Sequence, residues 1–373
     1  MKLIHLTVKR FNASSADSIY ISHLVEQFSK RLLADYRLIV GDKTPEQFGG
    51  VKVTNLRFRS WKNGKFHYWL PYAYYFFWFP YFIFTQKIKD SETVFFSSDI
   101  NLLVISIFWK KIFRNKFKIC SDWHLLFNNF KDGFVVKNSD YLITTSEKLK
   151  KQIVKRTGAD ACKIQVVYGG VDLSGYQIPF ASRSELGLPK GKTLVGYVGL
   201  FKTMGMEKGI NTMIEALQYA SKEIVTVFVG ARGEQKNEYG KIAKKFHVAD
   251  QCVFIDMQPT EKMPQYEKAM DMLVIPYPDK PHFRDFGFPM KVYEYMASGR
   301  PVIYSKLELV EEVIGDCAIG FAPDNAKDLA EKITEVQKNK SHSTELASKA
   351  YDKVKDYTWQ KKAEKIIKFI KLR

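Results

Sequence analysis

The sequence predicts an α/β protein of two domains, each built on a doubly wound parallel sheet. Its 373 residues suffice for two domains of ordinary size. Short apolar runs alternate with helical patterns along most of the chain, which is typical of parallel sheets with crossover helices. This alternation restarts near residue 194, after a junction at 174–189. We therefore expect an N-terminal domain at 1–176, a C-terminal domain at 177–356 and a final helix at 357–373.

The expected elements follow from apolar runs of strand length and apolar spacing of helical period. In the first half, strands are expected at 3–8, 38–40, 51–56, 94–97, 118–120, 141–145 and 164–167, and helices at 19–33, 100–107 and 147–156. In the second half, strands are expected at 194–198, 225–229, 253–255, 272–275 and 302–304, and helices at 211–220, 236–246, 262–269, 291–298, 309–314, 328–338 and 358–372. No short-period repeat is present.

The composition is that of a globular protein with a formal net charge of +18. Such a charge indicates a solvated basic surface, an anionic membrane, a phosphorylated substrate or a nucleic acid. No zinc-finger spacing, RNP-type motif or basic tail is present, so nucleic acid is not expected as a partner. The four cysteines form no C-x-x-C pair, which fits a reducing cytosol. The N-terminal apolar run is too short for a signal peptide and predicts a buried strand.

The segment Phe66–Phe84 is about two-thirds aromatic and carries two prolines. A membrane span needs about 20 predominantly apolar residues, and the tyrosines and prolines here argue against one. Tyrosine and tryptophan prefer the membrane–water interface. Basic residues flank the segment, and a second basic cluster follows at 110–118. These features predict contact with an anionic membrane surface, the alternative being a helix buried among aromatic residues of the N-terminal domain.

The stretch Phe286–Ile303 carries the clearest functional signal. It opens with a glycine turn, continues as a short helix bearing Lys291 and Glu294, and ends in an apolar strand. A helix N-terminus and its loop amides receive anionic oxygens, while a carboxylate accepts hydrogen bonds from a vicinal diol. The pattern therefore favours a ligand with both phosphates and hydroxyls.

This stretch closely resembles the donor-site segment of the retaining GT-B glycosyltransferases of family 4, where Pro-x-Lys-x-x-Glu-Tyr-Met-Ala-x-Gly-x-Pro-Val recurs. Four further stretches resemble the same family in the same order: 139–150, 163–172, 196–210 and 227–233. The resemblance covers residues 90–373 well and the first 90 only in strand–helix order. It implies two Rossmann-like domains facing each other across a cleft, with the C-terminal helix crossing back to the N-terminal domain.

The resemblance also implies roles for residues of the donor side. Glu294 corresponds to the glutamate that binds the ribose of a nucleotide-sugar. Lys208, after a glycine-containing loop and before Gly209, is expected to neutralise the leaving diphosphate, with Lys202 assisting or remaining a solvated loop residue. Lys291 either pairs with Glu294 or reaches a phosphate.

Two positions depart from the family pattern. Leu200 stands where an arginine is usual, and Phe286 stands where an acid contacts the transferred sugar. Asp285, or the backbone amides of Gly287 and Phe288, are the expected substitutes for that acid.

On the acceptor side, His124 follows a predicted strand at the edge where open α/β sheets bind ligands. It resembles the strand-end histidine of the family, with Asp122 as a weaker candidate. The loop after the first strand lacks paired glycines and is expected to line the cleft through Asn12 and Ser14. The expected catalytic set is therefore His124, Lys208 and Glu294.

The resemblance implies transfer of a sugar with retention, by front-face attack. No Asp-x-Asp pair and no His/Cys cluster is present, so no metal or other cofactor is expected beyond the nucleotide-sugar. The expected acceptor is a membrane-associated, polyprenyl-diphosphate-linked saccharide, met at the cytoplasmic face of the cell membrane by a peripheral protein. The alternatives are a non-catalytic saccharide- or nucleotide-binding module on a degenerate scaffold, and a sugar-nucleotide epimerase of similar fold. An NAD dehydrogenase is excluded because no strand precedes Gly-x-Gly-x-x-Gly.

Overall fold

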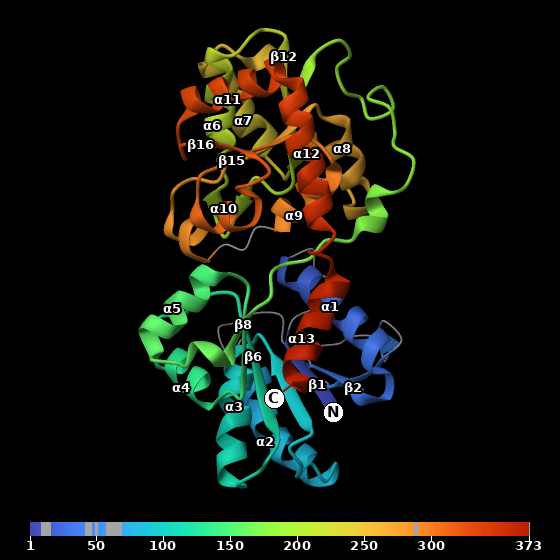
Figure 1. The fold of residues 1–373 in the computed structure, drawn as a ribbon, viewed down its shortest axis with the longest axis vertical. Helices are drawn as coiled ribbons and strands as arrows, with labels where there is room; N and C mark the ends of the chain where they lie inside the picture. Colours follow the sequence, from blue (N-terminus) through green and yellow to red (C-terminus); the bar gives the residue numbers. More distant parts are fainter. Residues whose placement is uncertain (9–15, 42–46, 49–50, 57–68, 287–289, 373) are drawn as a thin grey trace. The chain divides into compact units, whose positions relative to one another are not determined.

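The computed structural model describes residues 1–8, 16–41, 47–48, 51–56, 69–286 and 290–372. The chain divides into two compact units, each described by itself (Figure 1). Unit 1 comprises Met1–Tyr168 together with Trp359–Arg373, and unit 2 comprises Gly169–Thr358. The chain therefore leaves unit 1 a few residues before the expected boundary at 176, and its last helix belongs to unit 1.

Unit 1 is built on a sheet with strand order β3-β4-β2-β1-β5-β6-β7-β8, parallel except for the β3–β4 pair. Its strands are β1 (Lys2–Thr7), β2 (Tyr36–Val40), β3 (Gln47–Phe48), β4 (Val51–Asn55), β5 (Thr93–Ser97), β6 (Lys118–Trp123), β7 (Tyr141–Thr144) and β8 (Ile164–Val166). Its helices are α1 (Ala16–Leu32), α2 (Leu70–Thr85), α3 (Ile100–Ile112), α4 (Phe130–Asn138), α5 (Glu147–Thr157) and α13 (Trp359–Lys371). Figure 1 shows α1 and α13 side by side on one face of this sheet, with α3, α4 and α5 on the other.

Unit 2 is built on a parallel sheet with strand order β13-β12-β9-β14-β15-β16. Its strands are β9 (Thr193–Val198), β12 (Ile224–Ala231), β13 (Cys252–Asp256), β14 (Met272–Ile275), β15 (Val302–Ser305) and β16 (Ile319–Phe321), with a separate hairpin of β10 (Lys202–Thr203) and β11 (Met206–Glu207). Its helices are α6 (Ile210–Ala216), α7 (Gln235–Lys245), α8 (Met263–Ala269), α9 (Met290–Ser298), α10 (Glu308–Ile314), α11 (Ala326–Lys338) and α12 (Lys340–Val354). The two doubly wound sheets confirm the predicted fold class.

Some elements have no counterpart in the predicted set. Helix α12 buries Ser343, Ala347, Ala350 and Val354, mostly small residues that give a weak apolar signal at helical spacing. Helix α4 begins at the cap residue Asn129, whose side chain accepts from the Lys131 amide. The β10–β11 hairpin lies inside the predicted phosphate loop and is too short to show periodicity.

Candidate functional site

The candidate donor site lies at the topological switch point of unit 2. Strand β9 is flanked by β12, which follows it in the chain, and by β14, which comes later, so the strand order reverses there. In open α/β sheets, ligands bind outside the carboxyl ends of the strands at such a point. Gly199 follows β9 and Pro276 follows β14, and the loops they begin carry the residues described next.

Two glycines permit close packing around these strand ends. Gly199 has φ +133°, and a Cβ there would overlap the Lys291 ammonium. Gly209 has φ +90°, and a Cβ there would overlap the main-chain carbonyl oxygen of Pro276. Both positions therefore favour glycine for conformation, and Gly209 also requires it for space because the overlapping atom belongs to the main chain, whereas the Lys291 side chain could move. The first glycine lets a lysine of α9 lie over the end of β9.

Helix α9 carries the predicted pair Lys291 and Glu294. The Lys291 Nζ lies 3.9 Å from Glu294 Oε2, and the lysine side chain is only 13% exposed. The ammonium also lies 5.6 Å from the ring centroid of Tyr197 and 5.9 Å from that of Tyr295. The Tyr295 hydroxyl accepts from the Val198 amide at 2.8 Å and so fixes α9 to the end of β9. Glu294 remains one-third exposed and available to a ligand.

Lys208 belongs to the same cluster of charges. Burial and the nearby Lys291 ammonium lower the pKa of Lys208 to about 8, while Glu294 opposes this shift. The cluster thus holds two ammonium groups around one partly exposed carboxylate, an arrangement that an anionic ligand would stabilise. His282 lies close enough to Lys208 for burial and that charge to lower its pKa.

The amides at the start of α6 are occupied. The Glu207 carboxylate accepts from the backbone N–H groups of Gly209 (2.8 Å), Ile210 and Asn211 (3.3 Å). Lys202 likewise has a partner, Glu238, at 2.7 Å. An anion at this site would therefore be met by the ammonium groups of Lys208 and Lys291, with the Gly209 amide and Lys202 engaged elsewhere in this structure.

A second carboxyl group lies beside Glu294. Glu267 of α8 is 1% exposed, and its Oε2 accepts from the Tyr176 hydroxyl at 2.6 Å. Burial and the nearby Glu294 carboxylate raise the pKa of Glu267 to about 8, against the opposing effects of Tyr176 and Lys291. Tyr176 ends a 3₁₀ turn, Leu173–Tyr176, close to the start of unit 2. This hydrogen bond thus joins the entry segment of unit 2 to its ligand site.

We expect Glu267→Gln to flatten the pH dependence of stability. Because folding raises the pKa of Glu267, the folded wild type binds a proton more tightly than the unfolded chain between about pH 4.5 and 8, and its stability falls as pH rises through that window. The glutamine stays neutral, so the variant does not lose this stability. Between pH 5 and 8, the free energy of unfolding of Glu267→Gln should therefore rise relative to that of the wild type by a few kcal/mol. Denaturant unfolding at each pH measures this. The exposed Glu261→Gln is the matched control, and parallel wild-type and Glu267→Gln profiles would refute the expectation.

The acceptor-side candidates come together in unit 1. Asp122 Oδ2 lies 3.2 Å from His124 Nε2 and accepts from the Tyr20 hydroxyl at 2.7 Å. Asp122 is 3% exposed, while the His124 side chain is 27% exposed. The Tyr20 ring packs edge-on against the imidazole with centroids 4.4 Å apart. The weaker candidate, Asp122, thus contacts the stronger one directly.

The remaining predicted residues have separate outcomes. Asp285 lies 3.6 Å from the Arg284 guanidinium, in a π-helical segment His282–Phe286. Asn12, Ser14, Gly287 and Phe288 lie outside the described residues. Sequence reasoning missed Glu207, Glu267, His282, Tyr20 and Lys362. Glu207 lies within the predicted phosphate loop and bonds to amides two to four residues on, whereas the other four belong to no motif and gain their partners only through the fold.

Helix α2 presents aromatic residues on two faces. One face is buried in unit 1 and packs against α3. The other leaves exposed Leu70, Tyr74, Phe77, Tyr81 and Phe84, which recur at helical spacing. With exposed Trp69 just before α2, exposed Phe108 and Ile112 of α3 and exposed Phe113 just after α3, these residues make up what we call the aromatic patch. The buried face agrees with the alternative of a helix packed among aromatic residues of unit 1, and membrane contact through the exposed face stays a prediction.

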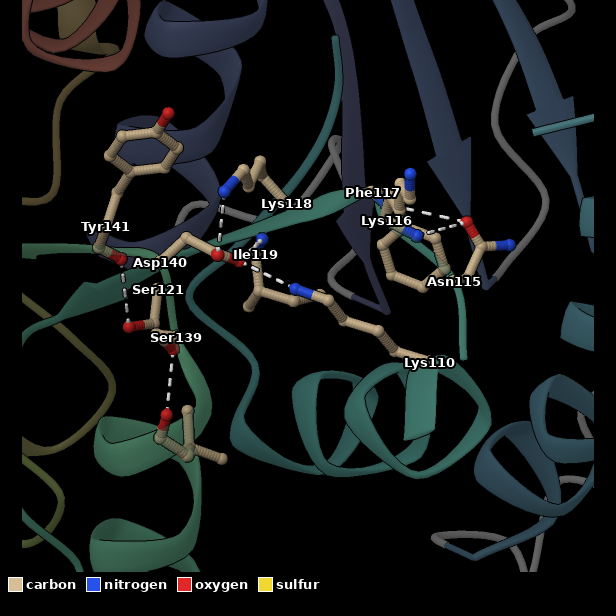
Figure 2. Close-up of polar contacts among 11 residues, drawn as sticks. Lys110, Asn115, Lys116, Phe117, Lys118, Ile119, Ser121, Ser139, Asp140 and Tyr141 are labelled. Carbon is tan, nitrogen blue, oxygen red and sulfur yellow. Dashed lines mark hydrogen bonds and ion pairs between the residues drawn. The ribbon is translucent and has the colours of Figure 1, made fainter. Parts of the chain in front are cut away.

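The basic residues near the patch divide into paired and exposed groups. Asp140 holds the paired group (Figure 2). Its Oδ2 accepts hydrogen bonds from Lys110 Nζ and from the Ile119 amide, each at 2.8 Å, and its Oδ1 lies 3.4 Å from Lys118 Nζ. Lys87, Lys89, Arg114 and Lys116 are exposed, with no carboxylate partner among the described residues. In the part of the chain that the structure describes, no helix is both long and apolar enough to cross a bilayer.

Two Rossmann-like units with a charged site at the switch point of the second define the GT-B class of fold. The whole chain superposes on HepE of Anabaena, solved with UDP, at TM-score 0.77 with 16% identity and complete coverage of both chains. It also superposes on a glycosyltransferase from Rickettsia africae at TM-score 0.80 with 14% identity, covering all of this chain and 98% of that one.

Within unit 2, residues 180–353 match the model of the family "Glycosyl transferases group 1". A D-inositol 3-phosphate glycosyltransferase of Nocardia farcinica is 24% identical over 195 residues, covering 50% of this chain and 42% of that protein. A glycogen synthase of Mycobacterium tuberculosis is 26% identical over 235 residues, covering 61% and 53%. This chain thus spans about half the length of the curated relatives it matches. The predicted resemblance to group 1 glycosyltransferases is confirmed.

Proposed function

We propose that this protein is a glycosyltransferase that moves a sugar from a nucleotide-sugar donor to an acceptor saccharide, with retention of anomeric configuration. The observation that carries the proposal is the cluster of Lys208, Lys291 and Glu294 at the switch point of unit 2. Two ammonium groups suit a diphosphate, and a partly exposed carboxylate suits a ribose diol. Retention is inferred from the family resemblance. A relative solved with UDP supports a uridine nucleotide as the first donor to test.

In the proposed reaction the donor diphosphate departs while Lys208 and Lys291 stabilise the negative charge that develops on it. Lys208 is suited to this because it is held close to a like charge, so a developing anion relieves repulsion as it forms. Glu294 holds the ribose and so fixes the donor. His124 of unit 1 is proposed to bind a hydroxyl of the sugar or acceptor. The diphosphate oxygen that leaves takes the acceptor proton.

We further propose that the acceptor is a lipid-linked saccharide at an anionic membrane surface. The aromatic patch supports this because an exposed apolar surface of aromatic side chains seldom lies alone on a soluble protein. Lys87, Lys89, Arg114 and Lys116 supply the positive charge that attracts anionic headgroups. A polyprenyl diphosphate combines both chemistries, an apolar chain and an anionic head.

One set of observations favours a second candidate, a non-catalytic nucleotide-binding module on the same scaffold. Leu200 and Phe286 replace residues expected to contact the diphosphate and the sugar, Lys202 pairs with Glu238, and the α6 amides are taken by Glu207. This candidate predicts nucleotide binding without release of nucleoside diphosphate from any nucleotide-sugar.

We expect one nucleotide-sugar from a panel of UDP-, GDP-, ADP- and TDP-sugars to raise the melting temperature. A ligand at 100 times its Kd stabilises the folded state by about 2.7 kcal/mol. Glu294→Ala should abolish the shift, because the carboxylate that holds the ribose is gone. The exposed Glu331→Ala, on α11 of the same unit, should leave it unchanged. No shift with any donor would reject the donor site, and a shift without turnover in the presence of lipid-linked saccharides would favour the second candidate.

A further inference from the structure

Helix α13 places a lysine in the interior of unit 1. Lys362 is 2% exposed, and its Nζ donates to the main-chain carbonyl oxygens of Val167 at 2.7 Å and Tyr168 at 2.8 Å. The ammonium also lies 5.1 Å from the centroid of the Tyr20 ring. A buried ammonium is costly unless hydrogen bonds and a nearby anion compensate it. The carbonyl groups supply the hydrogen bonds, so the anion must be sought nearby.

The carboxylate whose charge acts on Lys362 is Asp122 at the end of β6, and Tyr20 links the two groups: its ring lies beside the ammonium and its hydroxyl donates to Asp122 Oδ2. Burial alone would raise the pKa of Asp122, but His124, Lys362 and Tyr20 together outweigh it and hold that pKa below its ordinary value. Burial lowers the pKa of Lys362 to about 8, and Asp122 acts against that shift. Both groups are therefore charged at neutral pH. The other titratable groups around them are His5 of β1, whose pKa burial lowers to about 4, the thiol of Cys120 and Lys365 of α13.

The carboxylate determines how His124 is presented. Its Oδ2 faces Nε2 of the imidazole at 3.2 Å, and an ionised carboxylate can only accept a hydrogen bond. The proton of a neutral His124 is therefore favoured on Nε2, which leaves Nδ1 as a hydrogen-bond acceptor. The edge-on Tyr20 ring, whose hydroxyl is bonded to the same carboxylate oxygen, restrains the imidazole from turning.

We propose that Asp122 and Lys362 are positioning residues for His124: the aspartate fixes its Nε2–H tautomer, and the lysine, bonded to the carbonyl groups of Val167 and Tyr168, holds the Tyr20 ring whose hydroxyl donates to that aspartate. This inference rests on the proposed function for its purpose, since it presents Nδ1 of His124 to a donating hydroxyl of the sugar or acceptor. Val167 and Tyr168 are the last residues of unit 1 before the chain enters unit 2. The lysine thus couples the geometry of His124 to the segment that connects the units.

The test is the tautomer of His124, observed by NMR of the full-length protein labelled with ¹⁵N-histidine at neutral pH without substrate. His124→Gln identifies its signals. We expect the Nε2–H pattern in the wild type and in Lys368→Met, a control on the exposed face of α13. Lys362→Met and Asp122→Asn should lose that pattern, and Lys362→Arg should retain it. An Nδ1–H pattern in the wild type, or an unchanged pattern in a folded Lys362→Met, would overturn the proposal.

A second measurement separates this inference from the proposed function. Asp122→Asn should lower kcat about tenfold with the donor and acceptor found for the wild type, while the melting-temperature shift produced by the nucleoside diphosphate alone stays unchanged, because the residues proposed to bind the diphosphate and ribose lie in unit 2. If the wild-type tautomer is Nε2–H and no nucleotide-sugar binds, the proposed function fails and the positioning of His124 stands. If nucleotide-sugar binds and the tautomer is Nδ1–H, the positioning fails alone.

Discussion

We expect Gly209→Ala to lower the free energy of unfolding by about 3 kcal/mol or more. The backbone at Gly209 has φ +90°, and the left-handed region costs an alanine roughly 1–2 kcal/mol. The added Cβ would also overlap the carbonyl oxygen of Pro276, a rigid main-chain atom, so the loop or the end of β14 must move. Displacing packed backbone costs about 1–3 kcal/mol more.

Gly205→Ala is the matched control, because it lies in the same loop with φ +76° and its Cβ would meet nothing within 4 Å. It should cost only the conformational part, about 1–2 kcal/mol. Urea denaturation followed by circular dichroism measures both variants. Equal losses would show that space at Pro276 does not matter. Gly209→Ala should also abolish nucleotide binding, since it displaces the adjoining Lys208.

We expect charging the aromatic patch to lower binding to anionic vesicles by about 100-fold or more. Phe77 and Phe84 are 74% and 83% exposed on α2. Burying one such side chain in an apolar phase contributes about 1.5–3 kcal/mol, and every 1.4 kcal/mol is about tenfold in affinity. Phe77→Glu with Phe84→Glu removes two such contributions and adds repulsion from the headgroups. Trp78 is a poorer site for this test because it stacks on Phe82 inside unit 1.

The measurement is co-sedimentation with vesicles of phosphatidylcholine and phosphatidylglycerol, at two salt concentrations. Met204→Glu with Tyr219→Glu adds the same charge at exposed apolar positions of unit 2 and should leave binding unchanged. If the wild type binds the mixed vesicles but not vesicles of phosphatidylcholine alone, the attraction of the basic residues to anionic headgroups is required in addition to the aromatic patch. Wild-type protein that fails to bind either vesicle would reject the membrane-associated acceptor.

Local pattern was enough to predict most of the fold. The strands of both sheets are short apolar runs, and their alternation with helices is visible without tertiary information. Helix α2 shows the limit of this reasoning: it is apolar all round, so no periodicity distinguishes the buried Tyr75 and Phe79 from the exposed Phe77 and Phe84. The positions of α3, whose Ser106 bonds to Tyr75, and of Phe95 and Phe117, which pack against Phe79, decide which face is covered.

Some residues of the candidate site could likewise be predicted from local sequence, and others are brought together only by the fold. Lys291 and Glu294 lie three residues apart on one helix, so their association follows from spacing alone. Glu267 and Tyr176 are 91 residues apart, and nothing local to either predicts a hydrogen bond. The same holds for Lys362 and the carbonyl groups of Val167 and Tyr168, which lie 195 and 194 residues away in the chain. Charged residues that the fold buries look, in sequence, like the many charged residues that stay in water.

The return of α13 to unit 1 has a consequence for biosynthesis. Trp359, Ile366 and Ile370 complete the interior of unit 1, yet they are translated after the whole of unit 2. Domains generally fold as units while the chain is being made, the N-terminal one first. Here unit 1 cannot complete its fold until unit 2 has been synthesised, and until then the side of α1 that packs against α13 stays uncovered. We therefore expect the nascent N-terminal unit to expose apolar surface, and so to be prone to aggregation, until α13 has been made.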